Sequence, residues 1–138
     1  EDINRLYGII KDLDPDIKLL VWDDMFNPFH SGKEKFELQY GGVFGETSQA
    51  LDLIPKDIIF MIWWYDENDY ANIMKDSPYF FNSKGFDYLV AGFKNKKNIS
   101  NWAKIAESQK SCLGIIVTTW DGWKNNLDGI EYTAKVSW

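Results

Sequence analysis

The chain has one cysteine and one histidine in 138 residues. Cys112 cannot form a disulfide within the chain, and because it opens the apolar run from Leu113 to Val117 we expect a buried structural thiol. His30 lies in the segment Asn-Pro-Phe-His-Ser-Gly with no Cys or His companion nearby in sequence. We therefore expect a solvated or hydrogen-bonded histidine and no metal site.

Features of nucleic-acid, membrane and nucleotide-cofactor proteins are also missing. The net charge is -6, and the only concentration of basic residues is the short run from Lys94 to Lys97, which argues against nucleic acid as a partner. No segment approaches the ~18 consecutive apolar residues of a membrane span. Neither a G-x-G-x-x-G motif nor a P-loop occurs, so we expect no cofactor.

The composition is 45% hydrophobic and 26% charged, which predicts a single globular domain over residues 1–138. Aromatic residues are unusually abundant, at 17% of the chain with seven tryptophans. Many of these rings stand where predicted strands end.

Apolar periodicity predicts strands that alternate with helices. Four continuous apolar runs have strand length, and their continuity predicts strands covered on both faces: Leu19–Trp22, Ile58–Tyr65, Tyr88–Phe93 and Leu113–Trp120. Helical spacing predicts four helices: Ile3–Leu13, Asp69–Lys75, Asn98–Lys110 and a last helix from Asp128. The first ends before Asp14-Pro15, and the third has Asn98 or Ser100 as its expected cap. The connection from His30 to Pro55 is long, and only its end, Thr47–Leu53, has a helical pattern. This alternation predicts βαβ units and a parallel sheet.

Two architectures fit about four βα units. A small doubly wound sheet would carry a glycine-rich or acidic first turn for a phosphate or cofactor, and no such glycine motif is present. A (βα)8 barrel needs ~250 residues, so this chain would supply about half of one. The strand ends favour the barrel, because barrel sites are built from the carboxyl ends of strands, and three of the four ends here place Trp beside a carboxylate.

Side chains alternate along a strand, so the residues at these ends can be assigned to faces. Trp22 and Asp24 share one face, as do Trp63 and Tyr65, and also Thr118 and Trp120. We expect them to converge on one mouth, with Asp23 on the opposite face of its strand. Flat rings stack on the C–H faces of a pyranose, and carboxylates accept bonds from its hydroxyls. The predicted substrate-binding residues are Trp22, Asp23, Asp24, Trp63, Tyr65, Trp120 and Asp121.

The strand ends resemble the C-terminal half of the catalytic barrel of family 20 glycoside hydrolases, the β-N-acetylhexosaminidases, and especially its hexosaminidase D-like branch. The resemblance is carried by LLVWDDMF, IIFMIWWYDEND, KGFDYLVAGFK and LGIIVTTWDGW, which match strands five to eight in order. It implies an α/β fold of about four parallel βα units forming the C-terminal half of a (βα)8 TIM barrel.

The resemblance also implies a function. It predicts cleavage of a terminal β-linked N-acetylhexosamine by a retaining route in which the sugar's own acetamido oxygen acts as the nucleophile. The family's general acid is a Glu preceded by Asp at the end of strand four, upstream of this chain, so no catalytic residue is expected here. Asp66-Glu67 follows strand six instead, and we interpret it as a cap for the helix near Asp69.

The chain departs from the family at two strand ends. Phe93-Lys94 stands where many members place a Tyr that holds the acetamido group, and Asp121 is one position out of the usual acidic pattern. Other tryptophans have structural interpretations: Trp64 and Trp102 are expected in the core, and Trp123 is a candidate for the rim.

Half a barrel has two open sheet edges. The expected partners are therefore a carbohydrate substrate and either the missing N-terminal half of the barrel or a second copy, without nucleic acid or membrane. Alone, the chain is expected to have little or no hydrolytic activity. The alternative is a non-catalytic flavodoxin-like or carbohydrate-binding α/β domain.

Overall fold

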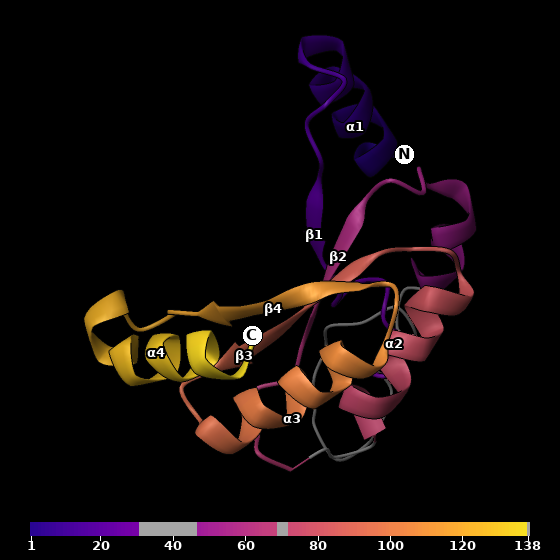
Figure 1. The fold of residues 1–138 in the computed structure, drawn as a ribbon. Helices are drawn as coiled ribbons and strands as arrows, with labels where there is room; N and C mark the ends of the chain where they lie inside the picture. Colours follow the sequence, from indigo (N-terminus) through magenta and orange to yellow (C-terminus); the bar gives the residue numbers. More distant parts are fainter. Residues whose placement is uncertain (31–46, 69–71, 138) are drawn as a thin grey trace.

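The computed structural model describes residues 1–30, 47–68 and 72–137. Its centre is a four-stranded parallel sheet in the order β1-β2-β3-β4 (Figure 1). The strands are β1 (Leu20–Trp22), β2 (Ile59–Trp63), β3 (Tyr88–Phe93) and β4 (Cys112–Thr118). All four predicted strands are present within two residues of their predicted limits.

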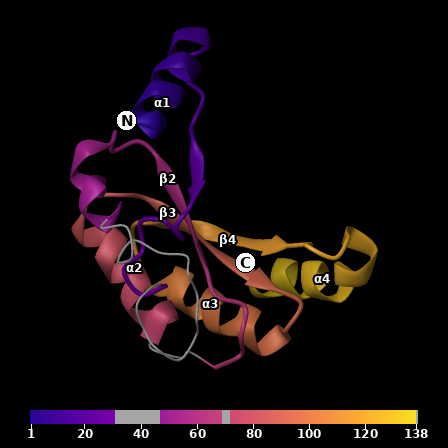
Figure 2. The same cartoon turned by 180° about the vertical axis from the view of Figure 1, so that it is seen from behind.

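The sequential strand order decides between the two architectures. A flavodoxin-like sheet reverses its strand order and carries helices on both faces. Here each strand pairs with the next in sequence. Three helices lie on one side of the sheet in both views (Figures 1 and 2): α2 (Ile73–Ser83), α3 (Lys96–Ser108) and α4 (Leu127–Val136). The fold is α/β with four parallel βα units, the arrangement found in half of a (βα)8 barrel, and the flavodoxin-like alternative does not fit.

The helices are close to their predicted positions, with two corrections. Helix α1 (Asp2–Leu13) and helix α4 (Leu127–Val136) agree with prediction, and η1 (Thr47–Leu53) is a 3-10 helix, as is η3 (Trp123–Asn126) before α4. Helix α2 spans Ile73–Ser83 rather than Asp69–Lys75, and it continues through Pro78. Residues 69–71 of the predicted helix, and most of the long connection after His30, lie outside the described residues.

Helix α3 (Lys96–Ser108) starts earlier than predicted, because its cap is Asn95 and not Asn98 or Ser100. The Asn95 side chain accepts from the backbone N–H groups of Lys97 and Asn98. Asn98 is instead fully buried, and its Nδ2 donates to the carbonyls of Trp64 at 2.7 Å and Asp66 at 2.8 Å. This amide therefore ties the end of β2 to α3.

The core lies between the sheet and the helices. From the sheet, the core receives the side chains of Phe60 and Ile62 in β2 and of Trp64 directly after β2. Helices α2 and α3 cover these side chains with residues such as Phe81 and Trp102. The opposite face of the sheet is only partly covered among the described residues, where Leu20 is 47% exposed and Leu113 is 53% exposed. The prediction of strands covered on both faces is wrong for this part of the chain, because helices pack on one side alone.

The sheet is strongly curved. Adjacent strands are ~4.8 Å apart, so side chains standing on β1 and β4 of a flat sheet would be separated by about 14 Å. The ring centroids of Trp22, at the end of β1, and Trp120, just after β4, are only 5.6 Å apart. The uncovered face is therefore concave, and its two edges lean toward each other at the carboxyl ends of the strands.

Helix α1 attaches by polar contacts and through Ile3 and Tyr7, which are partly buried and pack against the core. It buries no residue, and the Tyr7 hydroxyl donates to Asp57 Oδ1 at 2.6 Å while Lys11 Nζ lies 3.1 Å from Asp57 Oδ2. Among the described helices, none combines the length and apolar character needed to cross a bilayer.

Candidate functional site

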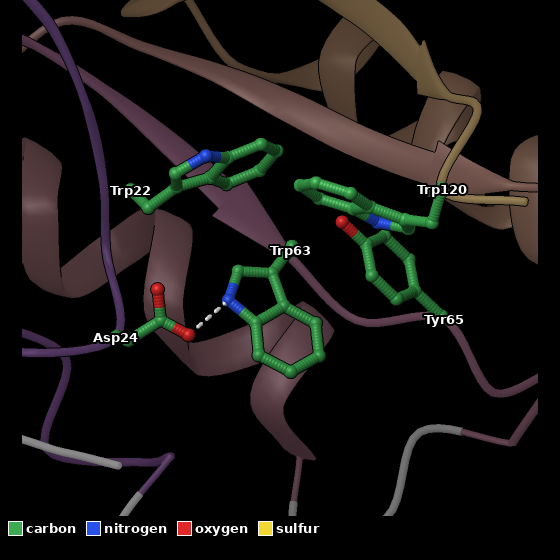
Figure 3. Close-up of a pocket in the computed structure, with 5 residues that line it drawn as sticks. All are labelled: Trp22, Asp24, Trp63, Tyr65 and Trp120. Carbon is green, nitrogen blue, oxygen red and sulfur yellow. Dashed lines mark hydrogen bonds between the residues drawn. The ribbon is translucent and has the colours of Figure 1, made fainter. Parts of the chain in front are cut away.

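A cavity of about 480 Å³ opens at the carboxyl ends of the strands on the concave face. Its walls are Trp22, Asp24, Trp63, Tyr65 and Trp120 (Figure 3). These are the residues that strand alternation assigns to one face, and they come from the ends of β1, β2 and β4. Rings and a carboxyl group from separate strands thus surround one space.

Trp63 organises the floor of this cavity. Its indole Nε1 donates to Asp24 Oδ1 at 2.6 Å, and its ring centroid lies 4.9 Å from that of Tyr65 (Figure 3). The Oδ2 atom of Asp24 has no hydrogen-bond partner within the described residues, so it is available to a ligand hydroxyl. Burial raises the pKa of Tyr65, although hydrogen bonding to Thr118 and Trp120 partly opposes this, so its hydroxyl is a neutral donor at physiological pH.

Asp23 lies on the other face of β1 and does not line the cavity. Its side chain is fully buried and accepts from Asn27 Nδ2, which also donates to Ser77 Oγ of α2 at 2.8 Å. Its backbone carbonyl accepts from the N–H groups of Phe26 and Asn27, both at 2.8 Å. Asp23 therefore builds the turn after β1, and the structure does not place it where a substrate would bind.

His30 was expected to be either solvated or hydrogen-bonded, and its burial rules out the first of these. It is 3% exposed, and its Nε2 lies 3.3 Å from Asp23 Oδ2, which is within ion-pair range but long for a hydrogen bond. Its ring packs on Trp63 with centroids 4.6 Å apart and planes tilted by 31°. The sequence placed no partner beside it, because Asp23 and Trp63 are 7 and 33 positions away.

The buried pair holds protons more tightly than free side chains do. Burial lowers the pKa of His30, but the close approach of the Asp23 carboxylate and the charges of Asp23 and Asp24 outweigh this, so the pKa lies above its ordinary value of 6.5. Burial raises the pKa of Asp23, and contacts with His30 and Asn27 oppose this only in part. The pair therefore keeps a proton at a pH where a free imidazole has lost it.

Stability should fall as pH rises above neutrality. The folded pKa of His30 is raised, so its contribution is fully present below the unfolded pKa near 6.5 and is lost as pH rises through the folded pKa. Urea unfolding of the wild type between pH 6 and pH 9 should show a decreasing free energy of unfolding. In His30→Gln this decrease should be smaller. Equal decreases in the two proteins would contradict the assignment.

Asp121 is also outside the cavity. Its carboxylate pairs with Lys94 Nζ and accepts from Asn126 Nδ2, which joins the end of β4 to the end of β3 and the start of α4. Lys94, directly after β3, has a left-handed backbone with φ 45°. Helix α4 packs closely on this residue, because a Cβ added at Gly129 would lie 3.3 Å from Lys94 Cα. Asp121 therefore holds packed elements together beside the cavity.

The remaining candidates have structural roles, and two of them, Asp66 and Cys112, differ from prediction. Trp64 and Trp102 are 5% and 0% exposed in the core, as predicted, and Trp123 is 59% exposed beside Lys124 without lining the cavity. Asp66 accepts from the backbone of Asn68, so it closes a turn and does not cap α2, whose N-cap is Asn72. Cys112 is half-buried and not the fully buried thiol that was expected.

The described residues gather no group of three or more His, Cys, Asp or Glu side chains able to hold a metal ion. In the comparison with known proteins, no family model matches the chain, and the search of curated proteins gave no match either.

Proposed function

We propose that the chain forms the sugar-binding wall of a glycoside hydrolase of the family 20 type, which removes terminal β-linked N-acetylhexosamine. The observation that carries the proposal is the cavity itself, where three indole rings, a phenol and a carboxylate meet at the carboxyl ends of parallel strands. This is the position of ligand sites in (βα)8 barrels. The sequence resemblance described above supports the choice of sugar.

The cavity offers the two kinds of contact that a pyranose needs. Trp22 and Trp120 present ring surfaces for its C–H faces. The second carboxylate oxygen of Asp24, which has no partner among the described residues, and the Tyr65 hydroxyl meet its rim of hydroxyls. Trp120 is 62% exposed, so a bound ring would cover an aromatic surface that water now contacts.

Hydrolysis in this proposal needs a group from outside the cavity wall. Asp24 is the only carboxyl group among the described residues that line the cavity, and it is held by Trp63. In the substrate-assisted route the acetamido oxygen attacks the anomeric carbon while an acid protonates the leaving oxygen. That acid would come from other strands, so the chain alone should bind sugar and not cleave a chromogenic N-acetylglucosaminide. A non-catalytic carbohydrate-binding domain is the second candidate, favoured by the presence of one carboxyl group among the described lining residues.

Replacing Trp120 by alanine tests the sugar site directly. We expect binding of N-acetylglucosamine, measured by isothermal titration calorimetry, to weaken by about tenfold, or ~1.4 kcal/mol, because a stacking surface is lost. Trp123→Ala is the matched control, since Trp123 is equally exposed but does not line the cavity. Equal losses in the two variants, or no binding by the folded wild type, would contradict the proposal.

The assembly follows from the sheet edges. Within the described residues, β1 pairs only with β2 and β4 only with β3, so each edge presents unpaired backbone groups. In our proposal these edges receive the strands that complete a barrel, from an N-terminal half or a second copy. Gel filtration should therefore show a dimer or a retained second fragment. A stable monomer without a co-purifying fragment would count against this.

A further inference from the structure

A buried acid and imidazole lie next to the cavity wall without lining it. The side chains of Asp23 and His30 are both completely shielded from solvent, with Nε2 3.3 Å from Oδ2. The turn after β1 does not need an ionisable imidazole here, because Asp23 already accepts from Asn27. The cavity chemistry described above does not use His30.

The pair is connected to the cavity through one residue. The Oδ1 atom of Asp23 lies 3.4 Å from the backbone N of Trp63, which donates to it, and the imidazole of His30 packs on the Trp63 ring at 4.6 Å. The same indole donates its Nε1 proton to Asp24. A short chain of contacts thus runs from the buried pair, through Trp63, to the carboxylate that faces the ligand.

We propose that His30 is a positioning residue, and that the proton held by the His30–Asp23 pair fixes Trp63 and Asp24 in the pose that binds sugar. The cavity then binds its ligand more tightly when the pair is protonated. This inference rests on the proposed function, because it concerns the affinity of that same cavity.

Electrostatics gives the direction of the coupling. With the proton, an imidazolium balances the Asp23 charge and faces the indole, a favourable cation–π arrangement. Without it, Asp23 is a buried charge that no cation among the described residues balances, since the neighbouring Asn27 and Ser77 are neutral and the nearby Asp24 is of like charge. Loss of the proton therefore releases the contacts that hold the Trp63 ring.

The single histidine makes the test direct. The imidazole proton signal of the wild type belongs to His30 alone, so its titration can be followed by NMR with and without saturating N-acetylglucosamine. We expect the sugar to raise the pKa of His30, and the affinity for sugar to fall about fivefold as pH rises through that pKa, because coupling between two sites is reciprocal. The glutamine of His30→Gln keeps a hydrogen-bond donor but does not titrate, so the affinity of this variant for N-acetylglucosamine should not change between pH 6 and pH 9.

The outcomes separate the inference from the proposed function. Sugar binding that leaves the wild-type His30 titration unchanged would overturn the inference alone, and this measurement needs no variant. The same pH dependence in His30→Gln as in the wild type would overturn it too. Absence of N-acetylglucosamine binding by the folded wild type at every pH would overturn the proposed function and, with it, the inference.

Discussion

Alanine at Asp23 should lower the free energy of unfolding by about 3–5 kcal/mol, which is the cost of leaving buried partners of a charged group unpaired. The replacement removes the acceptor of Asn27 and the counter-charge of His30, and all three side chains are inaccessible to water. Unfolding in urea at pH 6 measures the loss.

The neighbouring carboxylate supplies the matched control. Asp24→Ala should cost about 1 kcal/mol or less, because Asp24 is only partly buried and its carboxylate makes one hydrogen bond within the described residues, to Trp63. It should nevertheless weaken sugar binding more than any effect on stability explains. If both alanine variants unfolded at the same urea concentration, the assignment of the two aspartates to opposite faces would be wrong.

The two adjacent aspartates at the end of β1 thus have different roles. Alternation turns Asp23 toward the helices, where it organises the turn, and Asp24 toward the cavity. The alternation rule predicted from sequence that the two aspartates face opposite sides, as well as the faces of Trp63 and Tyr65. It did not prevent Asp23 from being counted among the substrate-binding residues, and the structure buries Asp23 away from the cavity. Continuous apolar runs and helical spacing were sufficient to predict the parallel α/β fold.

Other features were beyond sequence because they depend on contacts between distant residues. The burial of His30 follows from its packing on Trp63, and the approach of Trp22 to Trp120 follows from the curvature of the sheet. Asn95 and Asn98 are both residues of a type that caps helices well. Only the distant carbonyls of Trp64 and Asp66, which accept from the Asn98 amide, determine that Asn98 is buried and that Asn95 is the cap. Continuous apolar runs likewise do not reveal which face the helices cover.

The second large effect is expected at Trp63. Alanine there should reduce the affinity for N-acetylglucosamine by about a hundredfold or more, ~2.7 kcal/mol, because one change removes a cavity wall and the donor that holds Asp24. It should also lower the free energy of unfolding by about 3 kcal/mol, since the ring packs against His30 and Tyr65. Calorimetry and urea unfolding measure the two effects separately.

Two further variants separate binding from folding. Trp63→Phe keeps an aromatic ring but loses the Nε1 donor, so binding should weaken by about tenfold while most of the stability remains. Trp64→Phe is the matched control: Trp64 points into the core, where its Nε1 donates to the carbonyl of Asn68, and its replacement should reduce stability without changing affinity. Wild-type affinity in Trp63→Phe would show that the indole does not hold Asp24 for the ligand. A loss of affinity in Trp64→Phe equal to that in Trp63→Phe would mean that general loosening of the fold, rather than the cavity wall, controls binding.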